Sequence, residues 1–333
     1  MAKETAVILA GAVAKGAFEA GALEVLSPYV DELGITRLVG ASAGALNAAV
    51  FATGLRARAE RQVSKNLVEL WSDAATWHNV VDVNWRDIFS LTGVGTADRV
   101  LDLMRRAVAA PSSSTPRNVG LWVVLTALNG SEGSIAGQPA TTFESALSFR
   151  DADFDSAERR DRIFEAALGS AAFPVLFAPV EIKGVGACID GGAVNNGPVR
   201  LALDGSGVER IIVISPEPLL IEPKEPLSGL NLLGHVAEIL INERLYRDLH
   251  EAASINAYLA KLEQLKNDGV PAEVIERVKS VFHWRPLEIV QIRPPSALAG
   301  NAFDGFNKHS PLRDQYIDAG RLAAEQKLAA LRP

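Results

Sequence analysis

The stretch that decides the fold runs Arg37-Leu38-Val39-Gly40-Ala41-Ser42-Ala43-Gly44-Ala45-Leu46-Asn47. A short apolar segment ends in Gly-x-Ser-x-Gly, and a helix-compatible segment follows it. This order of strand, sharp turn and helix is the context that a nucleophile elbow requires. The turn would raise the Ser42 hydroxyl above the sheet edge, and Gly40 and Gly44 would let strand and helix pack closely. The Ala43 amide would lie at a helix N-terminus, where partial positive charge favours a developing oxyanion.

A second unit of strand, glycine-containing loop and helix precedes the elbow. Residues 5–10 form a near-continuous apolar run, which is typical of a strand covered on both faces of a parallel sheet. The loop from Gly11 to Gly16 follows, and residues 17–30 have helical spacing of apolar side chains. Backbone N–H groups at such a helix start form a general anion site. The glycine spacing does not match a nucleotide-binding loop, so nucleotide binding is disfavoured.

Composition excludes several classes of protein. The chain has 333 residues, of which 48% are hydrophobic and 22% charged, as expected for a globular protein with a sizeable core. Its net charge of −7 argues against nucleic-acid binding, which requires a basic surface. Cys188 is the only cysteine, so no disulfide can form within the chain and a cysteine-based metal site is disfavoured. No apolar run reaches the ~18 residues that span a bilayer.

The N-terminal segment partly imitates a secretory signal. Lys3 precedes an apolar run at residues 6–14 that ends in small residues. Glu4 weakens the charged region, and Gly11 interrupts a short apolar core. We therefore expect a buried first strand rather than a cleaved signal, and a cytoplasmic protein.

The remaining elements predict an α/β fold. Further strands are expected at 119–128, 185–189, 211–214 and 287–292, with a turn at Asn129-Gly130. Alternating strands and helices predict a three-layer α/β/α architecture around a mostly parallel central sheet, with a helical C-terminal portion. We expect one domain over residues 1–333, with a helical or irregular insertion at 57–118 and helices at 229–331 packed on the core.

The expected insertion concentrates large apolar side chains. Three of the five tryptophans lie there, as Trp71, Trp77 and Trp85, together with Ile88, Phe89 and Leu91. Such a segment could form a lid or an acyl-chain channel. The alternative is a helical insertion that packs on the core. Any membrane contact through residues 71–91 would be peripheral, and this stretch has no strong basic complement.

Asp190-Gly191-Gly192 follows the strand expected at 185–189, and on its own it is a typical turn. Together with the glycine loop and the Ser42 elbow, it resembles the patatin-like phospholipase family, the lipid acyl hydrolases of bacteria and plants. That family has a Gly-rich loop, then Gly-x-Ser-x-Gly, then Asp-Gly-Gly/Ala. The segment from Ser170 to Pro179 is similar to a further stretch of the family. The resemblance covers about residues 5–218 and implies that they form a catalytic core.

The resemblance implies a mechanism. A Ser–Asp dyad would replace the usual triad, with Asp190 accepting the Ser42 proton directly. Water activated by Asp190 would then hydrolyse the acyl-enzyme. Gly40, Gly44, Gly191 and Gly192 would shape the elbow and the turn. Candidate residues for the oxyanion hole are Gly11, Ala12, Val13, Ala14, Lys15, Gly16 and Ala43.

The loop departs from the family pattern at two positions. Gly11, Lys15 and Gly16 match it, whereas Ala12 and Val13 stand where glycines are expected. These residues keep the backbone N–H groups but have poor access to positive φ, valine above all. Either the loop uses negative φ throughout, or its donors point differently.

Three alternatives to the dyad hydrolase remain open. A Ser–His–Asp triad would need His235, His250, His283 or His309 as base. An acyltransferase would use the same serine, and a lipid-binding or regulatory protein would have lost catalysis through the altered loop. All share a lipid ester partner, whose class the sequence does not define. No cofactor is implied, and the scattered histidines offer no metal site.

Overall fold

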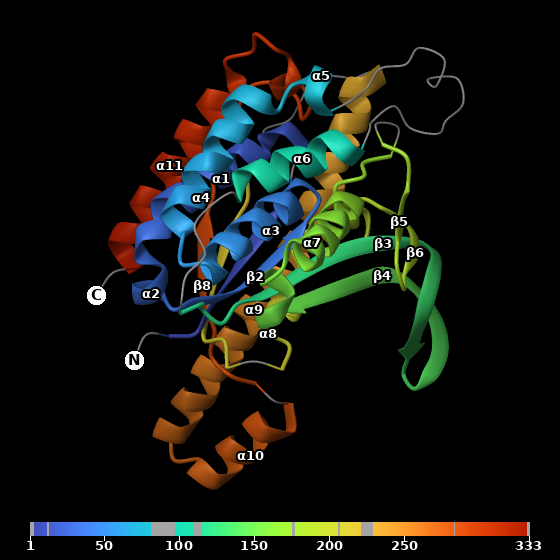
Figure 1. Cartoon of the computed structure of the whole chain (residues 1–333). Coiled ribbons are helices and arrows are strands. Elements are labelled where there is room, and N and C mark those ends of the chain that lie inside the picture. The colour runs from blue at the N-terminus through green and yellow to red at the C-terminus, as the bar shows by residue number, and fades with distance from the viewer. Residues whose placement is uncertain are drawn as a thin grey trace.

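The computed structural model describes residues 3–11, 13–80, 97–108, 115–174, 177–205, 207–220, 229–282 and 284–331. An eight-stranded sheet forms its centre, in the order β5-β6-β3-β2-β1-β7-β8, with β4 paired to β3 (Figure 1). The five parallel strands are the middle of this order: β3 (Gly120–Ile135), β2 (Ile35–Ala41), β1 (Thr5–Ala10), β7 (Arg210–Ile214) and β8 (Glu288–Ile292). The predicted α/β fold with a largely parallel sheet is confirmed.

The antiparallel part of the sheet is a long hairpin and a short one. β4 (Gln138–Arg150) pairs with β3, and β5 (Val180–Ile182) and β6 (Gly186–Ile189) continue the sheet. The distal half of the β3–β4 hairpin projects from the body (Figure 1). The turn predicted at Asn129-Gly130 is wrong. The register shifts there, Gly130 has a φ of 68°, and the strands reverse at residues 136–137 instead.

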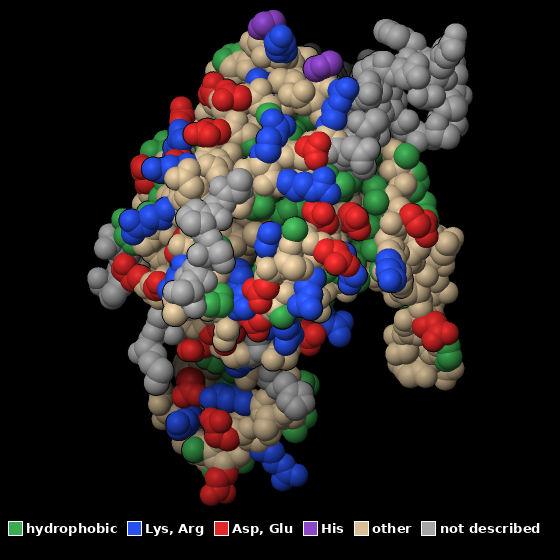
Figure 2. Space-filling model, in the orientation of Figure 1, with side chains coloured by type: hydrophobic (Ala, Val, Ile, Leu, Met, Phe, Trp, Pro, Cys, Tyr) green, Lys and Arg blue, Asp and Glu red, His purple; other side chains and the backbone are tan. Residues whose placement is uncertain are grey.

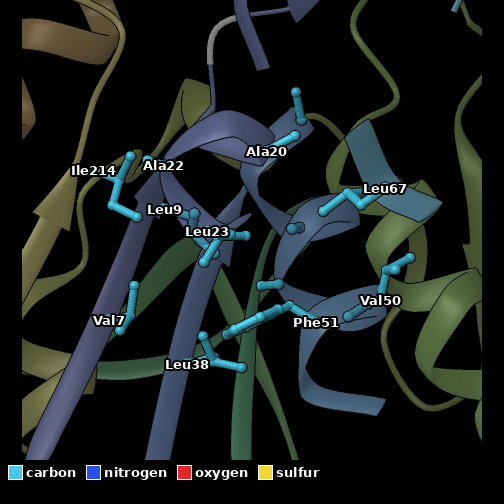
Figure 3. Packing of buried hydrophobic residues seen from close by; sticks show 14 of the residues in the cluster. Val7, Leu9, Ala20, Ala22, Leu23, Leu38, Val50, Phe51, Leu67 and Ile214 are labelled. Carbon is cyan, nitrogen blue, oxygen red and sulfur yellow. The ribbon is translucent and has the colours of Figure 1, made fainter. Parts of the chain in front are cut away.

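Alternate residues of β1 point to two separate helical layers. Val7 and Leu9 pack in a cluster with α1 (Gly16–Leu26), α3 (Ala43–Arg56), α7 (Ala157–Ser170) and α11 (Leu312–Leu331). Figure 3 shows Val7 and Leu9 beside Leu23 of α1, with Phe51 of α3 nearby. Ile8 packs in the other cluster, with α8 (Val199–Leu203) and α9 (Gly229–Asn267). This arrangement is the three-layer architecture expected of a strand that is buried on both faces.

The first and last long helices touch at two glycines. A Cβ at Gly21 of α1 would lie 2.1 Å from the Ile317 carbonyl oxygen, and a Cβ at Gly320 of α11 would lie 1.9 Å from that of Phe18. Only glycine lets the two backbones approach so closely. The α1–α11 pair therefore fixes the segment that follows the glycine loop.

The remaining elements cap the sheet or extend from it. α9 continues beyond the sheet and carries α10 (Ala272–Phe282) at its far end (Figure 1). Among the described residues, no helix combines the length and apolarity needed to cross a bilayer. The others are η1 (Val13–Lys15), η2 (Ser27–Tyr29), α2 (Val30–Leu33), α4 (Glu60–Glu69), η3 (Leu70–Ala74), α5 (Trp77–Val80), α6 (Ala97–Ala107), η4 (Asp151–Phe154), η5 (Gly191–Ala193) and η6 (Asp304–Phe306).

Charged side chains of both signs are mixed over the face seen in Figure 2. Lys and Arg alternate with Asp and Glu there and do not gather in one basic stripe. The whole sequence likewise contains both signs in similar numbers, with 33 Lys and Arg against 40 Asp and Glu. A basic stripe is the footprint that a nucleic-acid interface would need.

Candidate active site

Ser42 occupies a strained turn between β2 and α3. Its φ of 54° and ψ of −136° lie where residues other than glycine are rare. Glycines on both sides make the turn fit. A Cβ at Gly40 would lie 2.6 Å from the Gly44 carbonyl oxygen, and one at Gly44 would lie 2.3 Å from the Leu9 carbonyl oxygen. β2 and α3 therefore pack as closely as the sequence predicted, and a side chain at either glycine would prevent this packing.

The Asp190 carboxylate meets the Ser42 hydroxyl directly. Ser42 Oγ donates to Asp190 Oδ2 at 2.7 Å, and both residues are only 4% exposed. The second carboxylate oxygen accepts from the Gly192 N–H at 2.8 Å, so the turn after β6 orients the whole group. Thr126 on β3 donates to the Asp190 carbonyl oxygen at 2.7 Å. The geometry thus brings together two side chains that are 148 positions apart in the chain.

Burial changes the acidity of this carboxyl. Loss of hydration raises the pKa of Asp190 from 3.8 to about 6, and the hydrogen bonds from Ser42 and Gly192 oppose part of that rise. The group is still mostly ionised at pH 7. It can therefore accept a proton there while being a stronger base than an exposed aspartate.

Ser170 holds the Ser42 elbow in place, although the Gly-x-Ser-x-Gly motif gives no indication of this contact. Ser170, at the end of α7, accepts a hydrogen bond from the Ser42 N–H at 3.0 Å and is fully buried. It starts the stretch from Ser170 to Pro179 that resembled the family. The resemblance was therefore the only signal that pointed to it.

The glycine loop lies against the elbow. A Cβ at Gly11 would lie 2.5 Å from the Ala41 carbonyl oxygen and 2.6 Å from the Ala43 nitrogen, so a larger residue has no room. Asn196, fully buried, donates from Nδ2 to the Gly11 carbonyl oxygen at 2.9 Å. Because Asn196 lies a few residues after Asp190, this bond connects the loop to the turn that carries the aspartate. No spacing rule in the sequence marked Asn196.

Val13 adopts the conformation for which valine is least suited. Its φ is 52°, so of the two alternatives left open by the sequence, negative φ throughout the loop does not hold. Ala12 lies outside the described residues. The Ala14 N–H already donates to the Ala302 carbonyl oxygen at 3.0 Å, which removes it from the candidate oxyanion donors. The Lys15 side chain is buried and pairs with Glu217 at 2.8 Å.

An apolar cavity of about 80 Å³ opens beside Ser42 and Asp190. One wall is a single face of α3, and other lining residues come from α4, η3, α5, α6, α7 and η6. Val13 and Ala43 line it next to the serine, and Phe173 and Phe306 stand among its aromatic residues. None of the described residues that line it is a lysine, arginine or histidine. Such a cavity suits an uncharged chain rather than a headgroup.

The predicted insertion contributes part of this cavity. Leu70, Trp71 and Val80 line it. Trp71 Nε1 also donates to Asn47 Oδ1 at 2.8 Å, and Asn47 Nδ2 donates to Glu19 Oε2 at 2.7 Å. Burial raises the pKa of Glu19 to about 8, so this carboxyl is mostly neutral at pH 7. The other apolar residues predicted for a lid or channel, Trp85, Ile88, Phe89 and Leu91, lie outside the described residues.

The histidines lie elsewhere. Of the described ones, His78, His235, His250 and His309, none lines the cavity, and His283 is outside the described part of the chain. Within the described residues, no group of three His, Cys, Asp or Glu side chains could hold a metal ion. The partner of the Ser42 hydroxyl is a carboxylate, which a Ser–His–Asp triad would not place there.

Comparisons with known proteins give a family and several similar folds. The crystal structure of VipD from Legionella pneumophila is 14% identical, covers 99% of this chain and 67% of its own, and has a TM-score of 0.47. The type III effector protein ExoU is 15% identical, with 99% and 53% coverage and a TM-score of 0.36. The complex of SpcU with ExoU from Pseudomonas aeruginosa is 16% identical, covers 99% of this chain and 74% of its own, and has a TM-score of 0.29. No curated protein matches in sequence.

The family model described as patatin-like phospholipase matches residues 7–203. This range contains the glycine loop, the Ser42 elbow and the Asp190 turn. Because the match spans more than half of the 333 residues, the chain belongs to the patatin-like phospholipase family.

Proposed function

We propose that this protein is a serine acyl hydrolase that cleaves the carboxylic esters of phospholipids or lysophospholipids. The observation that carries the proposal is the 2.7 Å hydrogen bond from Ser42 Oγ to Asp190 Oδ2. A nucleophile within hydrogen-bond reach of its base is the arrangement that covalent catalysis needs. Family membership supports the same class of substrate.

The reaction follows two steps. Ser42 Oγ attacks the ester carbonyl carbon as Asp190 takes its proton, and the resulting tetrahedral intermediate expels the alcohol, which leaves with that proton. An acyl-enzyme remains on Ser42. Asp190 then takes a proton from water, and the hydroxide attacks the acyl carbon. The bond to Ser42 Oγ breaks, the oxygen regains the proton, and a fatty acid is released.

The negative charge that develops on the carbonyl oxygen needs donors beside Ser42. We assign this role to the backbone N–H groups of Val13 and Ala43, the loop and elbow residues that line the cavity next to the serine. Ala43 begins α3, where the first N–H groups have no partner within the helix and the dipole is positive. Gly11 would set the spacing between the two segments.

The apolar cavity would hold the acyl chain of the substrate. Its described walls carry no cation that could bind a phosphate, so the headgroup would remain at the mouth. Recognition would therefore depend on the acyl group, and several headgroups would be accepted. The described helices α4, α5 and α6 would form the wall of an acyl channel.

Covalent labelling and ester turnover test the proposal together. A fluorophosphonate probe should label wild-type protein at Ser42, and Ser42→Ala should abolish both labelling and hydrolysis. Asp190→Asn should lose hydrolysis with the fold intact. Ser64→Ala, which changes another fully buried serine, is the matched control. Full activity of Ser42→Ala would overturn the proposal.

A second candidate is a lipid-binding or regulatory protein without catalysis. The positive φ of Val13 favours it, because strain in the loop could misplace the oxyanion donors. In that case the cavity would bind lipid while no ester is turned over and no probe attaches to Ser42. An acyltransferase would instead give a transferred product with an added alcohol acceptor, which mass spectrometry of the products distinguishes from free fatty acid.

A further inference from the structure

We infer that the cavity limits the length of the acyl group, with Val50 at its closed end, so that chains of about eight to ten carbons fit best. The inference rests on the proposed function, because it places the acyl carbonyl carbon at Ser42 Oγ. It adds a preference by chain length, which family membership does not supply.

The cavity follows one face of α3 away from Ser42. The residues of α3 that line it are Ala43, Leu46, Asn47 and Val50. Leu46, Asn47 and Val50 follow Ala43 by three, four and seven positions, which places all four residues on one face of the helix. With a rise of about 1.5 Å per residue, the row extends roughly 10 Å from Ala43 to Val50.

The row ends where two helices come into contact. Val50 is 1% exposed and lines the cavity together with Leu67 of α4 and Met104 of α6, each 2% exposed. One turn further along α3, a Cβ at Gly54 would lie 2.8 Å from Cβ of Val63 on α4. The two helices therefore leave no room for a chain to continue along this face.

The length of the row translates into a number of carbons. An extended hydrocarbon chain advances about 1.3 Å per carbon, because single bonds of about 1.5 Å meet at tetrahedral angles. The roughly 10 Å from Ala43 to Val50 then accommodates about eight carbons beyond the carbonyl group. A chain of sixteen carbons would leave about half of its length outside the cavity.

The apolar cavity walls should select acyl groups by their length rather than by their polarity. The one polar side chain in the row is Asn47, and its amide is already bonded to Gly16, Glu19 and Trp71. It therefore needs no partner from a ligand. Each methylene that enters the apolar walls should raise affinity about fourfold, and each one that stays outside should add little.

The first test uses a series of p-nitrophenyl esters from four to sixteen carbons, below their critical micelle concentrations. For wild-type protein, kcat/KM should be highest at about eight to ten carbons. Val50→Ala should move the maximum by one or two carbons toward longer chains. Val50→Phe should move it toward shorter chains. Val30→Ala, at a buried valine of α2 outside the cavity, removes the same two methyl groups and should leave the maximum unchanged.

The second test does not depend on catalysis. Calorimetric titration of Ser42→Ala with saturated fatty acids should show affinity rising about fourfold per carbon up to about ten carbons and levelling beyond. Adding Val50→Ala should shift the break to longer chains, and this arm remains informative if Val50→Phe does not fold.

Two results would overturn the inference. One is an affinity or kcat/KM that keeps rising to sixteen carbons. The other is a chain-length profile that Val50→Ala moves no more than Val30→Ala does. If the fatty-acid series breaks near ten carbons but wild-type protein hydrolyses no ester, the length limit stands and the proposed function fails.

Discussion

Replacing Asp190 by asparagine is expected to stabilise the fold at pH 8 while it removes ester hydrolysis. The carboxyl is fully buried, and burial raises its pKa from 3.8 to about 6. Because one pKa unit corresponds to about 1.4 kcal/mol, keeping Asp190 ionised at pH 8 costs the fold about 3 kcal/mol. Asparagine avoids this cost and keeps both hydrogen bonds, accepting from Gly192 and donating to Ser42 Oγ.

The pH dependence of stability distinguishes the cost of the ionised Asp190 carboxylate from other effects of the substitution. Between about pH 4 and 6 the folded protein holds a proton that the unfolded chain has released, so this contribution to stability is lost as the pH rises through 6. About half of the 3 kcal/mol has been lost at pH 5. The stability of Asp190→Asn relative to wild type should therefore be about 1.4 kcal/mol greater at pH 8 than at pH 5.

Urea unfolding followed by circular dichroism at both pH values measures this difference. Asp268→Asn, at an exposed position just after α9, removes the same charge and should show no comparable change with pH. In wild-type protein, kcat/KM should fall tenfold per pH unit below about 6, because the base becomes protonated. A relative stability that does not vary with pH, or that has the opposite sign, would refute the account of Asp190.

Three further predictions concern residues around the site. Asn196→Ala should lower kcat by about tenfold or more with little change in KM, because the glycine loop loses its anchor; Asn195→Ala is the neighbouring control, and equal losses in both would contradict this role. Lys15→Met should cost about 3 kcal/mol in urea unfolding, because the buried Glu217 loses its ion-pair partner. The double variant Lys15→Met/Glu217→Leu should recover most of that loss. Gly320→Ala should destabilise the protein by about 1–3 kcal/mol or more in the same assay, and an effect below about 0.5 kcal/mol would contradict the close helix contact.

The central strands and the elbow could be predicted because their causes are local. The apolar run of β1 and the glycine-flanked Ser42 specify strand, turn and helix within a short window. The joint spacing of the glycine loop, the elbow and Asp190 then indicated the family. These are features that a single chain displays without any knowledge of its tertiary contacts.

The β3–β4 hairpin could not be predicted for a physical reason. Asn129-Gly130 is a strong local turn sequence, yet pairing with β4 resumes beyond it, so the glycine is accommodated as an irregularity in a longer ladder. β4 itself is largely exposed or half-buried and lacks the apolar run that marks a strand. Tertiary pairing outweighed the local preference.

The residues that position the site were also beyond sequence reasoning. Thr126 and Asn196 act through single long-range hydrogen bonds and belong to no spacing pattern, and Ser170 was marked only as the start of the stretch that resembles the family. The positive φ of Val13 could not be predicted from the sequence either. The sequence indicated that valine disfavours that conformation, but the neighbouring Ala14–Ala302 and Asn196–Gly11 bonds are tertiary contacts.

The glycine contact between α1 and α11 has a consequence for synthesis on the ribosome. α11 is translated about 15–60 s after α1, at about 5–20 residues per second, and until then the partner surface for Gly21 does not exist. The face of α1 that packs on α11 would stay uncovered during that interval, which makes the nascent chain a candidate for chaperone binding. Because α1 follows the glycine loop, we expect the loop to reach its final position beside Ser42 only after α11 has been made, and the proposed hydrolysis to begin only then.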